Sequence, residues 1–268
     1  MALPEPPSFD AVDPSQPESV RNLPPLSGDA RSWLKEDQPN KYERKLQQYE
    51  RTLWKGENSA SPPDDARSLL REAYESKLEN LQTVDDLVAE RLDALEETNQ
   101  LERTYIFYMT DNGYLLGEHR LVGKGLPYEE SIRTPLLVRG PGVPAGQSRG
   151  QLVANVDIAQ TFAELAGASS PANTDGRSLA PLLTESPPQK WRKVQLLESS
   201  PWSGVRMERY AYVEYETDER ELYDLQEDPY ELKSIDESAD PALLGDLHAR
   251  LEALRNCTGD SCRKSDGP

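Results

Sequence analysis

A long amphipathic segment followed by an apolar run most restricts the folds open to this chain. From residue 68 onward, apolar residues recur every three or four positions, which predicts one face of a long helix. These residues are Leu70, Tyr74, Leu78, Leu81, Val84, Val88, Leu92 and Leu95. The β-branched and aromatic run at 104–110 then predicts a strand buried on both faces. A helix that leads into a buried strand indicates an α/β sheet, and the helix must lie on something apolar.

The rest of the chain divides into segments of different character. Residues 1–66 hold many of the 22 prolines and predict an irregular segment that is helical only at 42–54. Residues 67–188 continue the α/β pattern, and residues 189–268 predict a smaller antiparallel sheet with a terminal helix. The later elements expected are a strand at 135–139, a helix at 153–166 closed by Gly167, strands at 193–197, 204–215 and 221–225, and a helix at 243–254.

The charge of the chain limits its partners. A net charge of −18 repels nucleic acid and anionic membrane surfaces at long range, so neither is expected as a partner.

No run approaches the roughly 18 apolar residues of a membrane span, and the first residues lack the basic and apolar regions of a signal peptide. As given, the chain is expected to stay in the cytoplasm. The sequence does not indicate an oligomeric state.

The two cysteines, Cys257 and Cys262, predict a small disulfide, because Gly259 and Asp260 between them can form the turn that brings the sulfurs together. The alternative is a metal site, which needs two further ligands, and His119 and His248 are the chain's two histidines. A disulfide indicates an oxidising compartment, which conflicts with the absent signal peptide unless the chain begins downstream of its true start.

The loop after the first strand carries candidate site residues. Ligands of α/β sheets bind beyond the carboxyl ends of the strands, where Asp111 and Asn112 offer hard oxygen donors suited to Ca²⁺ or Mg²⁺. Gly113 allows the turn that aims both side chains into one site. The alternative is a plain Asp-Asn-Gly turn. His119 and Lys124 follow among glycines that permit close approach to an anion, and a cation beside a metal site neutralises a bound oxyanion.

Several runs together resemble the C-terminal half of a sulfatase of the N-acetylglucosamine-6-sulfatase and arylsulfatase type. The first reads Thr-Asp-Asn-Gly-Tyr-Leu-Leu-Gly-Glu-His-Arg, and the second Gly-Lys-Gly-Leu-Pro-Tyr-Glu-Glu-Ser-Ile-Arg-Thr-Pro-Leu-Leu-Val-Arg-Gly-Pro-Gly. Further matches are Leu-Val-Ala-Asn-Val-Asp-Ile-Ala-Gln-Thr at 152–161 and Asp-Gly-Arg-Ser-Leu at 175–179. The resemblance covers residues 68 to 262 and is specific as an ordered set.

The resemblance implies an alkaline-phosphatase-like α/β fold, incomplete at the N-terminus, with a smaller C-terminal antiparallel sheet. In that family an Asp-Asn pair completes a Ca²⁺ site, which carries over to Asp111 and Asn112. A lysine binds the sulfate oxygens, which carries over to Lys124, and His119 matches a histidine that lines the pocket near the ester oxygen. These four residues are the expected metal ligands and catalytic residues, and the implied substrates are sulfated carbohydrates or aryl sulfates.

Three further residues match the family pattern in the same stretch. They are Tyr128, Glu129 and Arg133. We expect them to pack the loop and to form an ion pair.

The chain also departs from the family pattern. Sulfatases oxidise the cysteine, or sometimes the serine, of a Cys-x-Pro-x-Arg motif to formylglycine, but neither Cys257 nor Cys262 has Pro at +2 and Arg at +4. The family's paired aspartates follow its first strand, whereas the pair at 64–65 is expected in a loop and the pair at 85–86 in the long helix. Because Ca²⁺ takes about 6–8 oxygen ligands, two obvious ligands predict weak affinity in this chain alone.

The leading hypothesis is a hydrolase of sulfate esters in a truncated form that lacks the formylglycine nucleophile. One alternative is a non-catalytic binding or scaffold protein derived from a sulfatase, and another is a related phosphodiesterase or phosphonate hydrolase. The family and the cysteine pair favour a secreted or periplasmic protein. The apolar face of the 68–98 helix and both faces of the first strand are expected to lack part of their covering.

Overall fold

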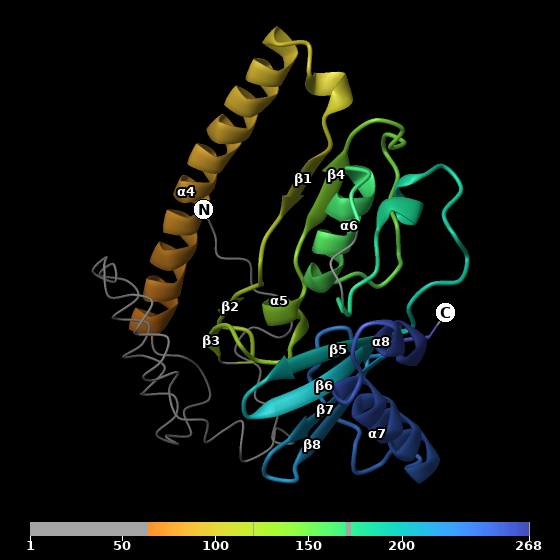
Figure 1. Cartoon of the computed structure of the whole chain (residues 1–268). Coiled ribbons are helices and arrows are strands. Elements are labelled where there is room, and N and C mark those ends of the chain that lie inside the picture. The colour runs from red at the N-terminus through yellow and green to blue at the C-terminus, as the bar shows by residue number, and fades with distance from the viewer. Residues whose placement is uncertain (1–63, 120, 170–172, 268) are drawn as a thin grey trace. The chain divides into compact units, whose positions relative to one another are not determined.

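The structure is a computed structural model, and it describes residues 64–119, 121–169 and 173–267 (Figure 1). The chain forms two compact units by its backbone contacts. One unit comprises residues 1–101, 112–133 and 230–233, and the other comprises residues 102–111, 134–229 and 234–268. The helix expected at 42–54 lies outside the described residues, as does nearly all of the expected Pro-rich segment 1–66.

The first unit contains the long helix α4 (Asp64–Glu97), which confirms the helix expected from residue 68. Its start packs well, since Leu70 and Ala73 are buried together with Val122. Farther along, its apolar side chains are 37–49% exposed, so this face is uncovered among the described residues, as expected; they are Leu81, Val84, Leu87 and Val88.

The two aspartate pairs lie in α4. The pair at 85–86 is exposed in the helix, as expected. The prediction that the pair at 64–65 lies in a loop is wrong, because α4 begins at Asp64.

Short elements complete the first unit. The strands β2 (Leu115–Leu116) and β3 (Val122–Gly123) pair antiparallel. The four-residue helix α5 (Glu129–Ile132) follows, beginning after the fully buried Tyr128. These elements bound the loop that carries the candidate site.

In the second unit, the strands β1 (Ile106–Met109) and β4 (Leu136–Arg139) form an antiparallel pair, which confirms both expected strands (Figure 1). The prediction that the first strand is buried on both faces is wrong. Its residues are only partly buried, and Tyr108 is 37% exposed. The reason is that β4 is the single strand paired with β1 among the described residues.

Helix α6 (Ile158–Leu165) packs beside this pair, with the rings of Phe107 and Phe162 in edge contact at 4.9 Å. The short 3₁₀ turn η2 (Asn155–Asp157) precedes it, so the helix expected at 153–166 is confirmed with an irregular start. Gly167, at φ 64°, ends the helix in the left-handed conformation, as expected for a glycine cap. A second 3₁₀ turn, η3 (Ala180–Leu183), follows.

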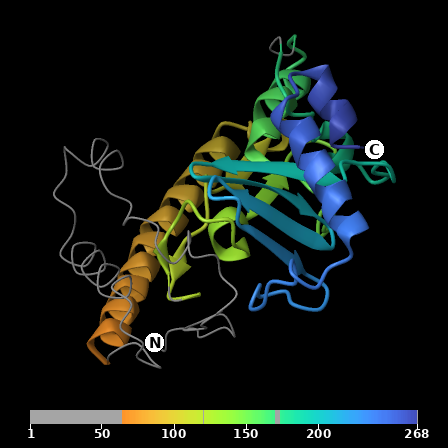
Figure 2. The same ribbon diagram turned by 90° about the horizontal axis from the view of Figure 1, so that it is seen from below.

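The second unit also contains a four-stranded antiparallel sheet in the order β5-β6-β7-β8. Its strands are β5 (Val194–Ser199), β6 (Trp202–Met207), β7 (Tyr210–Tyr215) and β8 (Arg220–Asp224). The stretch 204–215, expected as one strand, is a hairpin that turns at residues 208–209. Helix α7 (Pro241–Arg255) confirms the expected terminal helix and lies across one face of the sheet (Figure 2).

A short helix, α8 (Asp260–Ser265), ends the described chain and was not expected. It holds Cys262, which forms the expected disulfide with Cys257 at a Cα–Cα distance of 4.9 Å. No helix in the described ranges is long and apolar enough to cross a lipid bilayer.

A buried ion network ties distant segments of the second unit together. The Arg192 guanidinium donates to both carboxylate oxygens of Asp157 at 2.7 Å and to Asp266 at 2.8 Å. The three side chains are 2%, 0% and 7% exposed, respectively. Burial raises the pKa of Asp266, and the hydrogen bond from Arg192 opposes that rise.

We expect Arg192→Met to lower the free energy of unfolding by about 3–5 kcal/mol, because it leaves two buried carboxylates without their shared cation. The exposed pair of Arg250 with Asp246, at 2.7 Å, offers the matched control. Arg250→Met should cost no more than about 1 kcal/mol. Urea denaturation of both variants followed by circular dichroism measures the difference, and equal losses would contradict the role of the network.

Candidate functional site

The loop after β1 brings two of the expected site residues together. Lys124 Nζ donates a hydrogen bond to Asn112 Oδ1 at 2.7 Å, and Asn112 Nδ2 donates to the carbonyl of Gly113 at 2.8 Å. The side chain of Asn112 is therefore fixed from both ends. The ammonium of Lys124 is exposed, and it lies next to an amide oxygen that can bind a metal.

Asp111 is exposed, and it is the last residue of the second unit before the loop. Its backbone carbonyl accepts a hydrogen bond from Asn155 Nδ2 at 2.7 Å. Asn155 belongs to the turn η2, which precedes α6. This residue was not among the expected site residues, although it lies within the matched run at 152–161.

Gly113 is required by a close approach. Its N–H donates to the Ser131 carbonyl at 2.9 Å, and a Cβ at this position would clash with the backbone carbonyl of Glu130. Its φ is not positive, so the expected reason for this glycine, freedom to turn, is not the operative one. The glycine lets the loop lie directly against α5.

The glycines around the candidate residues do adopt the left-handed region. Gly117, Gly123 and Gly125 have φ values of 120°, 111° and 90°. The last two flank Lys124, and Gly125 N–H also donates to Ser131 Oγ at 3.2 Å. Backbone geometry therefore explains these glycines, and it fixes where the Lys124 side chain leaves the loop.

His119 lies in a different environment from Lys124. It is 3% exposed, its ring stacks on Tyr128 at a centroid distance of 4.1 Å, and its Nε2 lies 3.6 Å from Glu130 Oε2. No hydrogen bond or ion pair joins it to Lys124 among the described residues. Burial raises the pKa of the adjacent Glu118, while backbone N–H groups such as that of Leu116 oppose the rise.

The three residues expected to pack the loop behave as expected. Tyr128 is fully buried against His119. Glu129 and Arg133 form an ion pair across one helical turn at 3.6 Å. Sequence reasoning missed Glu231, whose carboxylate accepts the N–H of Glu129 at 2.8 Å. Since 102 residues separate that pair, no local pattern could have found it.

The donors of the loop fit Ca²⁺ in kind. Asn112 presents an amide oxygen and Asp111 a carboxylate, and both are hard ligands of the type that Ca²⁺ prefers. One lone pair of Asn112 Oδ1 is already used by Lys124, and a carbonyl oxygen has a second.

Comparisons with known proteins agree with the earlier resemblance. Residues 31–168 match a family model described as sulfatase, and residues 117–257 match one described as N-sulphoglucosamine sulphohydrolase, C-terminal. The chain is 34% identical to N-acetylglucosamine-6-sulfatase of Bos taurus over 72% of its length and 42% of that protein. It is 33% identical to an arylsulfatase of Chlamydomonas reinhardtii over 73% of its length and 36% of that protein. The chain thus spans less than half the length of these relatives.

Solved structures give the same result. A structure described as a complex with its substrate D-glucosamine-2-N,6-O-disulfate is 25% identical, with a TM-score of 0.75 over 99% of this chain and 61% of that chain. A phosphonate monoester hydrolase of Agrobacterium radiobacter is 28% identical, with a TM-score of 0.58 over 64% of this chain and 39% of that chain. These likenesses confirm the expected alkaline-phosphatase-like α/β fold class with its C-terminal antiparallel sheet.

We expect Gly113→Ala to destabilise the protein by about 1–3 kcal/mol, because the added methyl group must displace the loop or α5. Gly150→Ala is the control, since a Cβ there meets no atom within 4 Å and its φ is not positive. Its effect should stay within about 0.5 kcal/mol. Thermal unfolding of both variants tests the prediction. Equal effects would mean that the close approach does not limit this position.

Proposed function

Because the chain belongs to the sulfatase family, we propose that it provides the metal-binding and sulfate-binding part of a hydrolase of sulfate esters. The observation that carries this proposal is the hydrogen bond of 2.7 Å between Lys124 Nζ and Asn112 Oδ1. This contact supports the proposal, because the cation that would bind a sulfate oxygen lies beside an oxygen that would bind Ca²⁺. Asp111, the preceding residue, would supply the second metal ligand.

Each of these residues has a distinct chemical role in the proposal. The ammonium of Lys124 carries three N–H donors, of which one points at Asn112, so others can reach sulfate oxygens. Lys124 would stabilise the charge that develops on those oxygens as the ester bond breaks. Bound Ca²⁺ would add positive charge at the same oxygens. The expected place of His119 near the ester oxygen stays a prediction.

The nucleophile of this reaction is not among the residues of this chain. The family's formylglycine forms in a Cys-x-Pro-x-Arg motif, which the 268 residues do not contain. We therefore propose that Lys124, Asp111 and Asn112 act together with a segment that carries this motif. Reading the source DNA upstream tests this directly. An intact upstream region without the motif would favour the non-catalytic alternative, a binding or scaffold protein.

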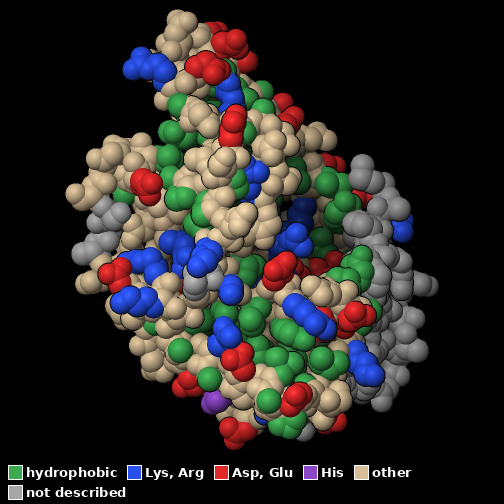
Figure 3. All heavy atoms as spheres, turned by 90° about the vertical axis from the view of Figure 1, so that its right-hand side faces the viewer, with side chains coloured by type: hydrophobic (Ala, Val, Ile, Leu, Met, Phe, Trp, Pro, Cys, Tyr) green, Lys and Arg blue, Asp and Glu red, His purple; other side chains and the backbone are tan. Residues whose placement is uncertain are grey.

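The proposed substrate is a sulfated carbohydrate. The relatives include an enzyme named N-acetylglucosamine-6-sulfatase and a structure solved with a disulfated glucosamine. The arylsulfatase relative keeps aryl sulfates as a second substrate class. The chain has a net charge of −18, but Figure 3 shows lysine and arginine side chains among the acidic ones on one face, so positive charge is still present locally on the surface.

A phosphonate or phosphate ester is the second candidate substrate, and the likeness to a phosphonate monoester hydrolase favours it. A lysine beside a metal ligand recognises anionic oxygens on either sulfur or phosphorus. We also propose a secreted or periplasmic location, because the disulfide of Cys257 with Cys262 is stable in an oxidising compartment.

We expect Lys124→Ala to lower kcat/KM for a sulfated sugar on the order of 100-fold or more, in protein expressed from the longest reading frame that contains this sequence. The side chain is exposed, so the free energy of unfolding should change little. Release of inorganic sulfate from 6-O-sulfated N-acetylglucosamine measures the rate, and a matched phosphate ester separates the two substrate classes.

Lys190→Ala is the control, because Lys190 is also exposed and lies far along the chain from the loop. It should retain full activity. Equal losses of activity and stability in Lys124→Ala would mean that Lys124 has a structural role only, and would contradict the proposal.

A further inference from the structure

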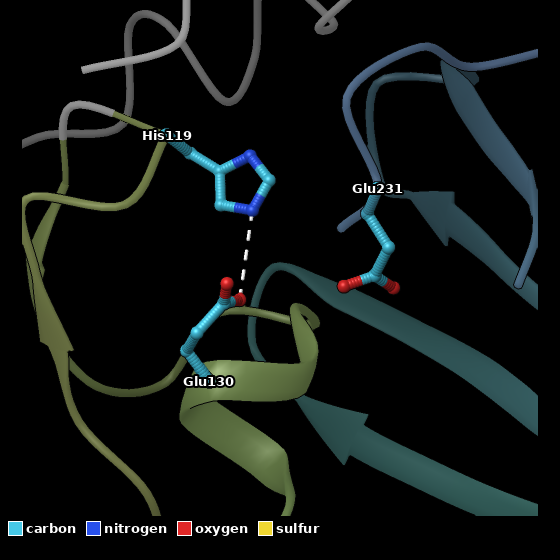
Figure 4. A group of neighbouring side chains, drawn as sticks. All are labelled: His119, Glu130 and Glu231. Atoms are coloured by element: carbon cyan, nitrogen blue, oxygen red, sulfur yellow. Dashed lines mark ion pairs between the residues drawn. The ribbon is translucent and has the colours of Figure 1, made fainter. Parts of the chain in front are cut away.

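Three side chains gather in the interior of the first unit, and the proposed function uses none of them apart from the predicted place of His119 near the ester oxygen. They are His119, Glu130 and Glu231, which come from the loop after β2, from α5 and from the segment 230–233 (Figure 4). One ligand atom of each lies within 4.8 Å of the others. His119 and Glu231 are 3% and 1% exposed, and the Glu130 side chain is 21% exposed, so two of the three residues are buried and the third is partly buried.

The imidazole of His119 is held in place but is not satisfied by hydrogen bonds. Stacking on Tyr128, with the two rings inclined by 17°, fixes its plane. In the part of the chain that the structure describes, neither ring nitrogen has a hydrogen-bond partner. Buried polar groups are nearly always paired, so two bare nitrogens on one buried ring point to a ligand.

The separation between His119 and Glu130 favours a metal over a direct hydrogen bond. Nε2 of His119 faces the carboxylate of Glu130 across 3.6 Å (Figure 4). Hydrogen bonds of this kind are about 2.7–3.2 Å long. Two ligands of a tetrahedral Zn²⁺ ion, each about 2.0–2.1 Å from the metal, lie about 3.3 Å apart, so a small closure would suit a shared ion.

Glu231 is oriented as metal-binding carboxylates commonly are. Its Oε2 accepts the backbone N–H of Glu129 at 2.8 Å, which fixes the direction of the carboxylate. Both His119 and Glu231 also have positive φ values, 53° and 52°, which are costly for residues with a side chain. The fold therefore holds both residues in a strained backbone conformation that points them into the same group.

We propose that His119, Glu130 and Glu231 bind one divalent transition-metal ion of the Zn²⁺ type. One imidazole and two carboxylates are a donor set that suits Zn²⁺, and a hard cation such as Ca²⁺ rarely takes an imidazole. The ion would bind the imidazole and both carboxylates at once. It would also join three segments of the first unit, so that metal binding adds to the stability of that unit.

Zinc binding by the full chain tests the proposal without reference to activity. Protein dialysed against a chelator is titrated with Zn²⁺ alone, and the bound metal is counted by mass spectrometry after gel filtration. We expect one tightly bound Zn²⁺ per chain and a higher melting temperature. Co²⁺ in the same site should give the visible absorption of a tetrahedral ion with a nitrogen ligand.

Two variants of the cluster and two controls decide the assignment. His119→Ala and Glu231→Gln should each weaken Zn²⁺ binding by at least about tenfold. Glu231→Gln keeps an acceptor for the Glu129 N–H, so it tests binding even where His119→Ala folds poorly. His248→Ala removes the other histidine, which is exposed and paired with Glu214, and it should bind Zn²⁺ as the parent does. Asp111→Ala, in the proposed Ca²⁺ site, should also leave Zn²⁺ binding unchanged.

Several results would overturn the proposal. They are a parent protein that retains no Zn²⁺, a Glu231→Gln variant that binds as tightly as the parent, or Ca²⁺ bound in preference to Zn²⁺ at this cluster. Loss of zinc binding in His248→Ala would place the ion elsewhere. The proposed function is tested by the catalytic activity of the Lys124→Ala variant, whereas this site is tested by Zn²⁺ binding. Failure of one proposal is therefore measured separately from failure of the other.

Discussion

The second unit depends on a single buried cation. Arg192 lies just before β5, the first strand of the four-stranded sheet, and donates two hydrogen bonds to Asp157. The same Asp157 accepts the backbone N–H groups of Ala154 and Arg177, at 2.8 and 2.9 Å. One carboxylate thereby satisfies the start of the turn η2, which precedes α6, and a loop residue 20 positions after Asp157. Without Arg192, this carboxylate would be buried with only neutral donors, which is costly in a site without water.

The other arm of the network fixes the C-terminal end of the described chain. Asp266 binds Arg192 and also pairs with Arg177, so two cations face two carboxylates and the group is neutral as a whole. The backbone carbonyl of Asp266 accepts the N–H groups of Lys193 and Val194, at 2.9 and 3.2 Å. Asp266, which caps the short helix α8, thus links this helix to the start of β5 through both its side chain and its backbone.

Local patterns in the sequence predicted local structure well. The position of α4 follows from apolar periodicity, those of β1 and β4 follow from short apolar runs, and the disulfide follows from the spacing of two cysteines around a glycine turn. Helix α7 also lies where the sequence predicted a terminal helix. The residues of β1 alone predicted a strand buried on both faces, which is wrong, because burial depends on neighbouring strands and not on the strand itself. Only the resemblance to a longer family pattern indicated that part of its covering would be missing. The hairpin within 204–215 was missed because its turn at Glu208 and Arg209 contains none of the usual turn residues.

In the candidate site, too, residues within one loop could be predicted from the sequence, whereas contacts with distant residues could not. Asp111, Asn112 and Lys124 lie in one loop, and their residue types alone indicate chemistry for a cation and an oxyanion. The neighbours of His119 include Glu231, which is more than a hundred residues away and was not predicted. Only the fold could reveal that this histidine belongs to a different group of side chains from the lysine.

Burial separates the two kinds of polar residue that share this loop. Asp111 and Lys124 are exposed, so a ligand can reach them from solvent, and a flexible ammonium can follow a substrate as its charge changes. His119 is buried, as are Leu115 and Val122 on either side of it in the sequence. Stacking on Tyr128 fixes the plane of its ring. A ring held that rigidly suits the fixed geometry that a bound metal ion demands. The fourteen residues 111–124 therefore combine exposed side chains suited to an anionic ester with a buried histidine suited to holding the loop in place.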